Sequence, residues 1–199
     1  MPELKRLKII LVNFLIKNNK VKFNTHTEIN QMTETFLLGA TTLYEEYTMH
    51  YTAHREYFKE LRENVTALIT KKRLFSCMNT TKWLELQTAI HTLLFPPANI
   101  VRCVTDAENH PESVNAMTIL EEKIPSWFGC WSNYYCEGLP PLFNIEWMKV
   151  RPQLGKFRGA LIKPEIIDET NEFRAILERL NIPYEETGNI FTIYGYKAP

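Results

Sequence analysis

The sequence predicts an α+β protein: N-terminal helices, then a small, mostly antiparallel sheet with one C-terminal helix packed on it. Three observations predict this class. Helical spacing dominates before residue 95, the clearest strand lies at 143–150, and a helix followed by a hairpin signal occupies 168–196. This order differs from the regular alternation of a doubly wound sheet. We expect an N-terminal helical extension over residues 1–55 and an α+β main domain over residues 56–199.

The first third of the chain is predicted to be mainly helical. Residues 3–17 fit an amphipathic helix, although Leu7–Ile16 holds enough β-branched residues to form a strand instead. A long proline-free stretch from Thr33 to Lys72 then shows apolar residues at helical spacing. One helix of that length would exceed the usual globular range, so we expect a break near Thr48–His54.

A second helix is predicted in the middle of the chain. The cluster Asn79–Thr81 supplies N-cap side chains, and Phe95–Pro97 stops the helix. Its apolar face is expected to contain Trp83, Leu86 or Gln87, Ile90 and Leu94. A short strand over Asn99–Val104 and a short helix over Met117–Lys123 are expected to follow.

The segment Phe143–Val150 is the clearest strand in the sequence. Phe143, Ile145 and Trp147 fall on one face at a period of two, and polar residues interrupt the rest. We therefore expect one face of this strand to be more buried than the other.

The residues after this strand are predicted to turn and pair. We expect a turn over Arg151–Lys156 and a paired strand over Phe157–Ile162. Residues 155–159 read GKFRG, which combines two basic residues with two glycines. This segment lacks the spacing of a phosphate-binding loop and fits a hairpin turn with exposed charges.

The most regular helical pattern lies over residues 168–181. Its apolar positions occur at i, i+3, i+4 and i+7: Phe173, Ile176, Leu177 and Leu180. Asn181, followed two residues later by a proline, ends the helix. A turn at Thr187–Asn189 then joins Tyr184–Glu186 to Ile190–Tyr196 as a β-hairpin.

Composition and charge limit the classes of function. The chain of 199 residues is 45% hydrophobic and 23% charged, which is typical of a globular protein. Its 23 basic and 23 acidic residues cancel, so direct nucleic-acid binding is not expected. Residues 1–73 carry 12 Lys and Arg against 8 Asp and Glu, whereas residues 74–199 carry 11 against 15. The C-terminal part is therefore mildly acidic.

The cellular location is predicted from the N-terminus and the cysteines. The apolar run Ile9–Ile16 follows three basic residues, as in a signal peptide, but Asn13 interrupts it and no small-residue cleavage site follows. The run is also shorter than the about 20 residues that span a bilayer. Four cysteines without C-x-x-C spacing fit reduced thiols. We expect a cytoplasmic protein that does not contact a membrane.

Two residue pairs are candidates for chemistry, although no catalytic signature is present. His50 and His54 would share one face of a helix, as metal-ligating pairs do, but the glutamate of H-E-x-x-H is missing. Cys130 and Cys136 lie in an aromatic loop, where a nucleophilic thiol would need a nearby histidine. Packed or solvated histidines and inert thiols explain both pairs more simply, so we expect neither a metal nor a cofactor.

Two groups of residues are candidate interaction surfaces. The first is acidic and contains Glu165, Asp168, Glu169, Glu172, Glu185 and Glu186. It is either the normal carboxylate excess of a helix N-terminus or a patch that docks on a basic cleft. The second is aromatic and contains Trp127, Phe128, Trp131, Tyr134 and Tyr135. Such a loop supplies either core residues or the anchors of an interface.

Four segments carry a resemblance to a known family: Met78–Trp83, Phe143–Trp147, Arg158–Ile162 and Ile190–Tyr196. They resemble an uncharacterised bacterial family that is known only as a domain of unknown function. The resemblance covers roughly Glu60–Lys197 and leaves about the first 50 residues unmatched. It supplies no catalytic motif, and therefore no functional residues. By analogy, such small single-domain families often resemble immunity proteins that neutralise bacterial toxins.

The expected function is that of a non-enzymatic immunity protein. It would bind a cognate protein toxin in the cytosol and occlude the toxin's active site, with the acidic and aromatic groups as contacts. The alternatives are a small metal- or thiol-dependent enzyme, an immunity enzyme that reverses the toxin's modification, and a structural module that self-associates through its N-terminal helices.

Overall fold

The computed structural model describes most of the chain after residue 53. The described residues are 45, 48, 51, 52, 54–107, 111–132, 139–159 and 162–199. The chain divides into two compact units, Met1–Glu46 and Tyr47–Pro199, and every helix and strand named below belongs to the second unit. The predicted extension over residues 1–55 lies almost entirely outside the described residues, so it stays a prediction.

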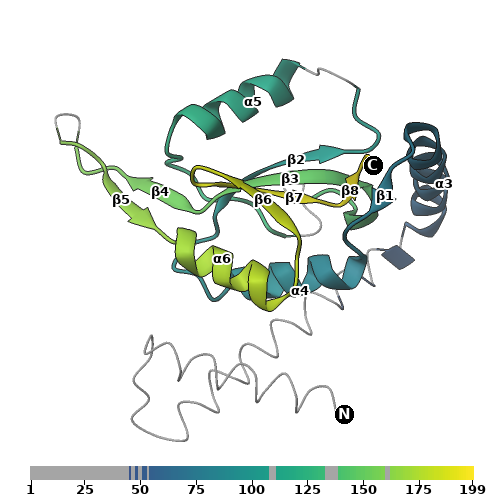
Figure 1. The fold of residues 1–199 in the computed structure, drawn as a ribbon, viewed down its shortest axis with the longest axis horizontal. Coiled ribbons are helices and arrows are strands. Elements are labelled where there is room, and N and C mark those ends of the chain that lie inside the picture. Colours follow the sequence, from purple (N-terminus) through teal and green to yellow (C-terminus); the bar gives the residue numbers. More distant parts are fainter. Residues whose placement is uncertain are drawn as a thin grey trace, which may run out of the picture. The chain divides into compact units, whose positions relative to one another are not determined.

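A four-stranded antiparallel sheet lies at the centre of the second unit (Figure 1), in the order β2-β3-β7-β6. Its strands are β2 (Ala98–Cys103), β3 (Ile145–Arg151), β6 (Tyr184–Thr187) and β7 (Ile190–Tyr194). β6 and β7 form the predicted hairpin, and Gly188 at its turn has a φ of +62°, a conformation that favours glycine. The unit is therefore an α+β domain, as predicted.

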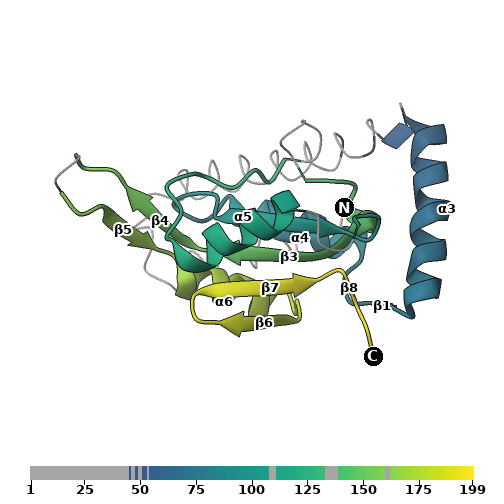
Figure 2. The ribbon, with the colours of Figure 1, turned by 90° about the horizontal axis from the view of Figure 1, so that it is seen from above.

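Helices cover both faces of this sheet (Figures 1 and 2). α4 (Thr80–Ile90) and α6 (Thr170–Arg179) lie on one face, and α5 (Pro111–Glu122) lies on the other. The main core forms between the sheet and the first two helices, and its most deeply buried side chains include Trp83, Leu86, Met148, Phe173, Leu177, Phe191 and Ile193. Burial of each such side chain stabilises the fold by about 1.5–3 kcal/mol relative to exposure.

The sequence patterns of α4 and α6 explain why these helices form where they do. Asn79 Oδ1 accepts a hydrogen bond from Lys82 N at 2.8 Å, so the predicted N-cap begins α4. Three of the predicted apolar positions of α6 are fully buried: Phe173, Ile176 and Leu177. Asn181 follows the end of α6 with a φ of 51°, as a helix-terminating asparagine should.

The ends of two helices differ from the prediction. Thr92 N and Thr92 Oγ1 both donate to Ala89 O, at 3.0 and 2.7 Å, and this tight turn ends α4 at Ile90. Leu94 was expected on the apolar face of that helix, but it lies beyond the helix and is 79% exposed. α5 begins earlier than predicted, at Pro111, because proline suits the first turn of a helix.

A β-bulge in β3 changes which side chains face the core. The pairing of β3 with β2 skips Glu146. Beyond the bulge Met148 and Val150 are fully buried, whereas Trp147 is half-buried on the opposite face. The bulge therefore interrupts the alternation of side chains between the two faces of β3. The prediction that Phe143, Ile145 and Trp147 share one buried face is wrong.

α3 (Arg55–Lys72) packs at one end of the sheet (Figure 2). It begins directly after the segment in which a break was predicted, and Arg73 ends it in a left-handed conformation. A second, smaller core joins α3 to the short helix η1 (Leu142–Asn144), and contains Phe58, Val65, Val104 and Phe143. β1 (Phe75–Ser76) follows α3 and pairs with β8 (Tyr196–Lys197).

At the other end of the domain, a two-stranded arm projects from the body (Figures 1 and 2). It consists of β4 (Gln153–Lys156) paired with β5 (Glu165–Asp168), together with the described connecting residues 157–159 and 162–164. The predicted turn over Arg151–Lys156 and the predicted strand over Phe157–Ile162 are therefore wrong. Pro152, which has no N–H to donate to a ladder, ends β3, and the chain continues at once as a new strand.

Candidate interaction surface

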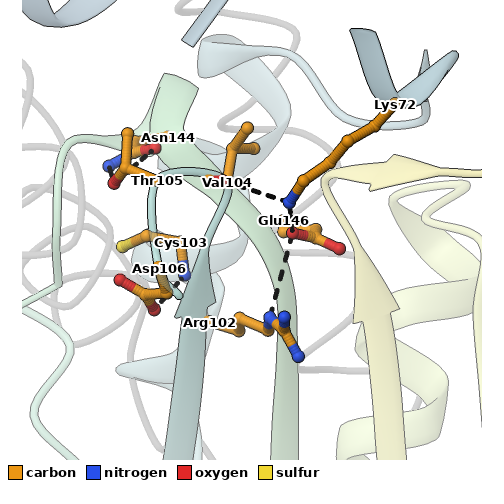
Figure 3. A network of polar contacts seen from close by, with 8 residues as sticks. All are labelled: Lys72, Arg102, Cys103, Val104, Thr105, Asp106, Asn144 and Glu146. Carbon is orange, nitrogen blue, oxygen red and sulfur yellow. Dashed lines mark hydrogen bonds and ion pairs between the residues drawn. The ribbon is translucent and has the colours of Figure 1, made fainter. Parts of the chain in front are cut away.

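A polar network around Glu146 joins α3 to the sheet (Figure 3). Glu146 Oε2 accepts a hydrogen bond from Lys72 Nζ at 3.3 Å and lies 3.9 Å from Arg102 Nε. Lys72 Nζ also donates to Val104 O at 3.3 Å. Because the bulge of β3 places Glu146 beside the last residue of α3, the network holds this helix against the end of the sheet.

The same network includes the loop after β2 (Figure 3). Cys103 N donates to Asp106 Oδ2 at 2.8 Å. Asn144 Nδ2 donates to Thr105 Oγ1 at 2.9 Å. Burial, and then the charges of Asp106 and Glu146, raise the pKa of the Cys103 thiol to about 12. A thiol with that pKa is protonated at neutral pH, which disfavours nucleophilic attack by Cys103.

The residue pairs that were considered for chemistry are only half described. His54 is exposed and directly precedes α3, and Cys130 Sγ lies 3.2 Å from Ser132 Oγ. His50 and Cys136 lie outside the described residues. Across the part of the chain that the structure describes, no group of three or more His, Cys, Asp or Glu side chains is placed to hold a metal ion. The structure thus places one member of each pair, and the absence of a metal or a catalytic thiol stays a prediction.

The two predicted glutamates of the C-terminal hairpin are held by neighbouring side chains. Lys197 Nζ and Tyr194 OH donate to Glu185 at 2.5 and 2.8 Å. Arg174 Nε and Nη2 donate to the two oxygens of Glu186 at 2.9 and 2.6 Å. Hydrogen bonds from Lys197 and from Arg174 lower the pKa values of these carboxyls. Because each carboxylate already has an intramolecular cation, neither adds much negative charge to a docking surface.

The predicted carboxylates near α6 do not form one acidic patch either. Glu165 is exposed on β5, opposite Lys156 of β4. Glu169 is only 4% exposed, and its Oε2 accepts a hydrogen bond from Leu94 N at 3.3 Å. The prediction that Glu169 contacts a partner is corrected, because its side chain turns inward to hold a loop. Glu172 is half-buried in the first turn of α6.

Asp168 has a structural role at the start of α6. Its Oδ1 accepts a hydrogen bond from Thr170 N at 2.9 Å, and its Oδ2 accepts one from Gln153 Nε2 at 2.8 Å. Desolvation opposes ionisation, but the hydrogen bonds from Thr170 and Gln153 outweigh it and hold the pKa of this carboxyl below its usual value. Asp168 therefore ties the base of the arm to the helix that follows.

Asp168→Ala is expected to lower the free energy of unfolding by about 1 kcal/mol at neutral pH, because it removes the side chain that accepts hydrogen bonds from Thr170 N and Gln153 Nε2. The pKa of the Asp168 carboxyl is lower in the folded chain than its value near 4 in the unfolded chain. The ionised carboxylate therefore contributes its full stabilisation above about pH 4, and this stabilisation is lost as the pH falls through the folded pKa. Urea unfolding of both proteins, at pH 7 and at about pH 3, measures it. An undiminished difference at the lower pH would contradict the assigned role.

The predicted aromatic loop is divided between core and surface. Trp131 is 6% exposed, and its Nε1 donates to Pro97 O at 2.8 Å, so this tryptophan is a core residue and not an exposed contact. Trp127 is 43% exposed and its neighbour Phe128 is 61% exposed. Two members of the loop lie outside the described residues: Tyr134 and Tyr135.

The loop over residues 124–131 is attached to the base of the arm. Gly155 N, in β4, donates to Pro125 O at 2.7 Å. At the other end of the loop, Gly129 N donates to Pro96 O at 3.0 Å. Three segments that lie far apart in the sequence are therefore neighbours in space: the loop after α4, the loop over residues 124–131 and the arm.

Large hydrophobic side chains are exposed on these neighbouring segments. Of the nine such side chains in the described residues, six lie on the arm or on the two loops at its base. We call them the arm-end surface: Leu94, Trp127, Phe128, Phe157, Ile162 and Ile166. Concentrations of exposed hydrophobic side chains usually mark the interaction sites of folded proteins.

Sequence reasoning missed four members of the arm-end surface as contacts: Leu94, Phe157, Ile162 and Ile166. Leu94 was assigned to a helix face, Phe157 and Ile162 were assigned to a paired strand, and Ile166 was assigned to no element. One local signal was present, because residues 155–163 mix hydrophobic and basic side chains without a clear period. Such a segment cannot bury its hydrophobic residues on one side of a regular element.

The fold and the arm-end surface together define a class: a small α+β domain that carries its exposed hydrophobic residues on a projecting arm. The chain belongs to the family of unknown function DUF6678, which matches residues 65–199. This match confirms the resemblance to an uncharacterised domain family and spans the sheet, the arm and helices α4 to α6. No curated protein and no solved structure matches the chain. None of the described helices combines the length and the apolar character needed to cross a membrane.

Proposed function

We propose that this chain is an immunity protein, which binds a cognate bacterial toxin in the cytosol and occludes its active site without catalysing a reaction. The arm-end surface is the observation that carries the proposal. Phe157 is 77% exposed and Ile166 is 53% exposed on an arm whose two strands pair only with each other among the residues that the structure describes. A partner that covers these side chains would remove from water the hydrophobic area that the domain itself leaves exposed.

The energetics suit an interface with a hydrophobic centre. Full burial of one Phe or Ile side chain stabilises an association by about 1.5–3 kcal/mol, so a few of these residues can dominate the binding free energy. The proposal keeps the function that the sequence suggests, but it moves the contact surface. Of the predicted contacts, Trp127 and Glu165 remain exposed at this end of the domain, whereas Trp131 and Glu169 are buried.

Affinity purification from the native cells tests this proposal. The C-terminus lies at the end of the domain opposite the arm (Figures 1 and 2), so a tag after Pro199 leaves the arm-end surface free. We expect one protein to co-elute with the wild-type chain in equal amount. The double variant Phe157→Ala, Ile166→Ala should lose this protein, because it removes two hydrophobic anchors.

A matched control removes two exposed hydrophobic side chains elsewhere. Tyr57 and Phe75 are 61% and 49% exposed, and neither belongs to the arm-end surface. Tyr57→Ala, Phe75→Ala should retain the co-eluting protein. The proposal fails if no protein co-elutes in a fixed ratio, and more clearly so if the purified chain contains a bound metal, which would favour the enzyme alternative.

A further inference from the structure

The β4–β5 arm carries a second feature, which is positive charge. Lys156, Arg158 and Lys163 are all exposed on it, and each stands next to or near an exposed hydrophobic side chain. None of the three makes an ion pair with a carboxylate in the described part of the chain. The outer part of the arm is therefore both hydrophobic and basic.

The negative charge on the arm cancels these cations only in part, because the two carboxylates Glu165 and Asp168 oppose three cations. Asp168 lies at the base of the arm, where Gln153 Nε2 and Thr170 N occupy its carboxylate oxygens. Glu165 is opposite Lys156 in the strand pairing, but no ion pair joins them. The net charge of the exposed arm is thus the opposite of what the acidic C-terminal composition suggests.

We propose that the arm enters an acidic cleft with hydrophobic walls on the toxin, so that carboxylates of the toxin face Lys156, Arg158 and Lys163. This inference rests on the proposed function and specifies the chemistry of the partner. The outer part of the arm, beyond the buried Gln153 and Leu154, projects from the body of the domain, which suits insertion into a cleft (Figures 1 and 2). Opposite charges at such a contact speed association and reject partners of the wrong sign.

Two other occupants fit the arm less well. A second copy of this chain would bring two sets of like charges together, and their repulsion would oppose association. A nucleic acid would attract the three cations but would leave the aliphatic side chains of Ile162 and Ile166 without apolar contacts. An acidic protein cleft satisfies both the cations and the hydrophobic residues.

Reversing the charge of the arm tests this inference. The probe is the protein that co-purifies with the wild-type chain, and the variant is Lys156→Glu, Arg158→Glu, Lys163→Glu. We expect its association rate constant at low salt to fall by at least about tenfold, and the dependence of that rate on salt to weaken or change sign. The control Arg55→Glu, Lys59→Glu, Lys71→Glu makes the same charge change on exposed positions of α3 and should associate at nearly the wild-type rate.

The possible outcomes separate this inference from the proposed function. If the partner binds the arm variant as fast as the wild type, the acidic cleft is disproved while the toxin-binding function stands. If no partner exists, both fail. Two further results would overturn the inference: a dimer in light scattering that the arm variant abolishes, or retardation of a single-stranded or duplex DNA probe that the arm variant abolishes. Circular dichroism of both triple variants confirms that the exposed substitutions leave the fold intact.

Discussion

Phe191→Ala is expected to lower the free energy of unfolding by about 3–5 kcal/mol, the usual cost of truncating a fully buried aromatic side chain. Phe191 lies on β7 at the centre of the main core and is 0% exposed. Its ring meets Phe173 of α6 edge to face, with 5.1 Å between ring centroids, and lies 5.5 Å from the ring of Tyr184. Urea unfolding monitored by circular dichroism measures the loss.

Phe157→Ala is the matched control for this prediction. It removes the same side chain from the arm, where the residue is 77% exposed. Because little area leaves water at this position when the chain folds, we expect a change in the free energy of unfolding within about 0.5 kcal/mol. A large loss of stability in this variant would mean that Phe157 is a core residue and would remove it from the arm-end surface.

Gly195→Ala is expected to lower the free energy of unfolding by about 3 kcal/mol or more, because the new methyl group would meet backbone. A Cβ at this position would lie 2.0 Å from Ile145 O. The backbone on both sides is fixed, since Gly195 N donates to Glu146 O at 2.9 Å and Gly195 O accepts from Cys77 N at 2.9 Å. The contact is therefore relieved only by separating the last strands from β3.

Gly155→Ala provides the comparison. A Cβ there would lie 3.6 Å from Pro125 O, which is an ordinary van der Waals distance, and Gly155 does not adopt a positive φ. We expect this variant to unfold at nearly the wild-type urea concentration. Equal destabilisation of the two variants would show that the effect comes from replacing glycine as such and not from the close approach of Gly195 to Ile145 O.

The parts of the fold that the sequence predicts well are those in which local rules and packing agree. The helix α6 has hydrophobic residues at a regular helical period and a terminating Asn181, and the structure confirms both. Asn79 acts as the N-cap of α4, and Gly188 stands at the turn of the C-terminal hairpin, as expected. In each case the local structure depends on side chains and backbone preferences within a few residues of the same segment.

The parts that could not be predicted depend on contacts between distant segments. The β-bulge at Glu146 forms where β3 pairs with β2. Glu146 there lies beside Lys72 and Arg102, and no local sequence pattern predicts this arrangement. The carboxylates of the expected acidic patch are held by partners that only the fold brings near, such as Arg174 for Glu186. Composition predicts how much charge a segment carries, but it does not predict which charges the fold neutralises.

The same reasoning explains how much of the candidate site was predictable. Trp127 and Phe128 belong to an aromatic loop that the sequence indicates as a possible interface, and both are exposed. Trp131 has the same side chain as Trp127, four residues further along, but it packs in the main core, where Pro97 O accepts a hydrogen bond from its indole N–H. The exposed arm could not be recognised from the sequence, because its exposure follows from how Pro152 ends β3.

The most direct test of the proposed function is a growth measurement on cells that express the co-purified partner. The partner alone should arrest growth, and co-expression of this chain should restore it. The Tyr57→Ala, Phe75→Ala control should restore growth as well as the wild type does, whereas Phe157→Ala, Ile166→Ala should not. A partner that leaves growth unaffected, or an arrest that persists in the presence of the wild-type chain, would contradict the assignment of this protein as an immunity protein.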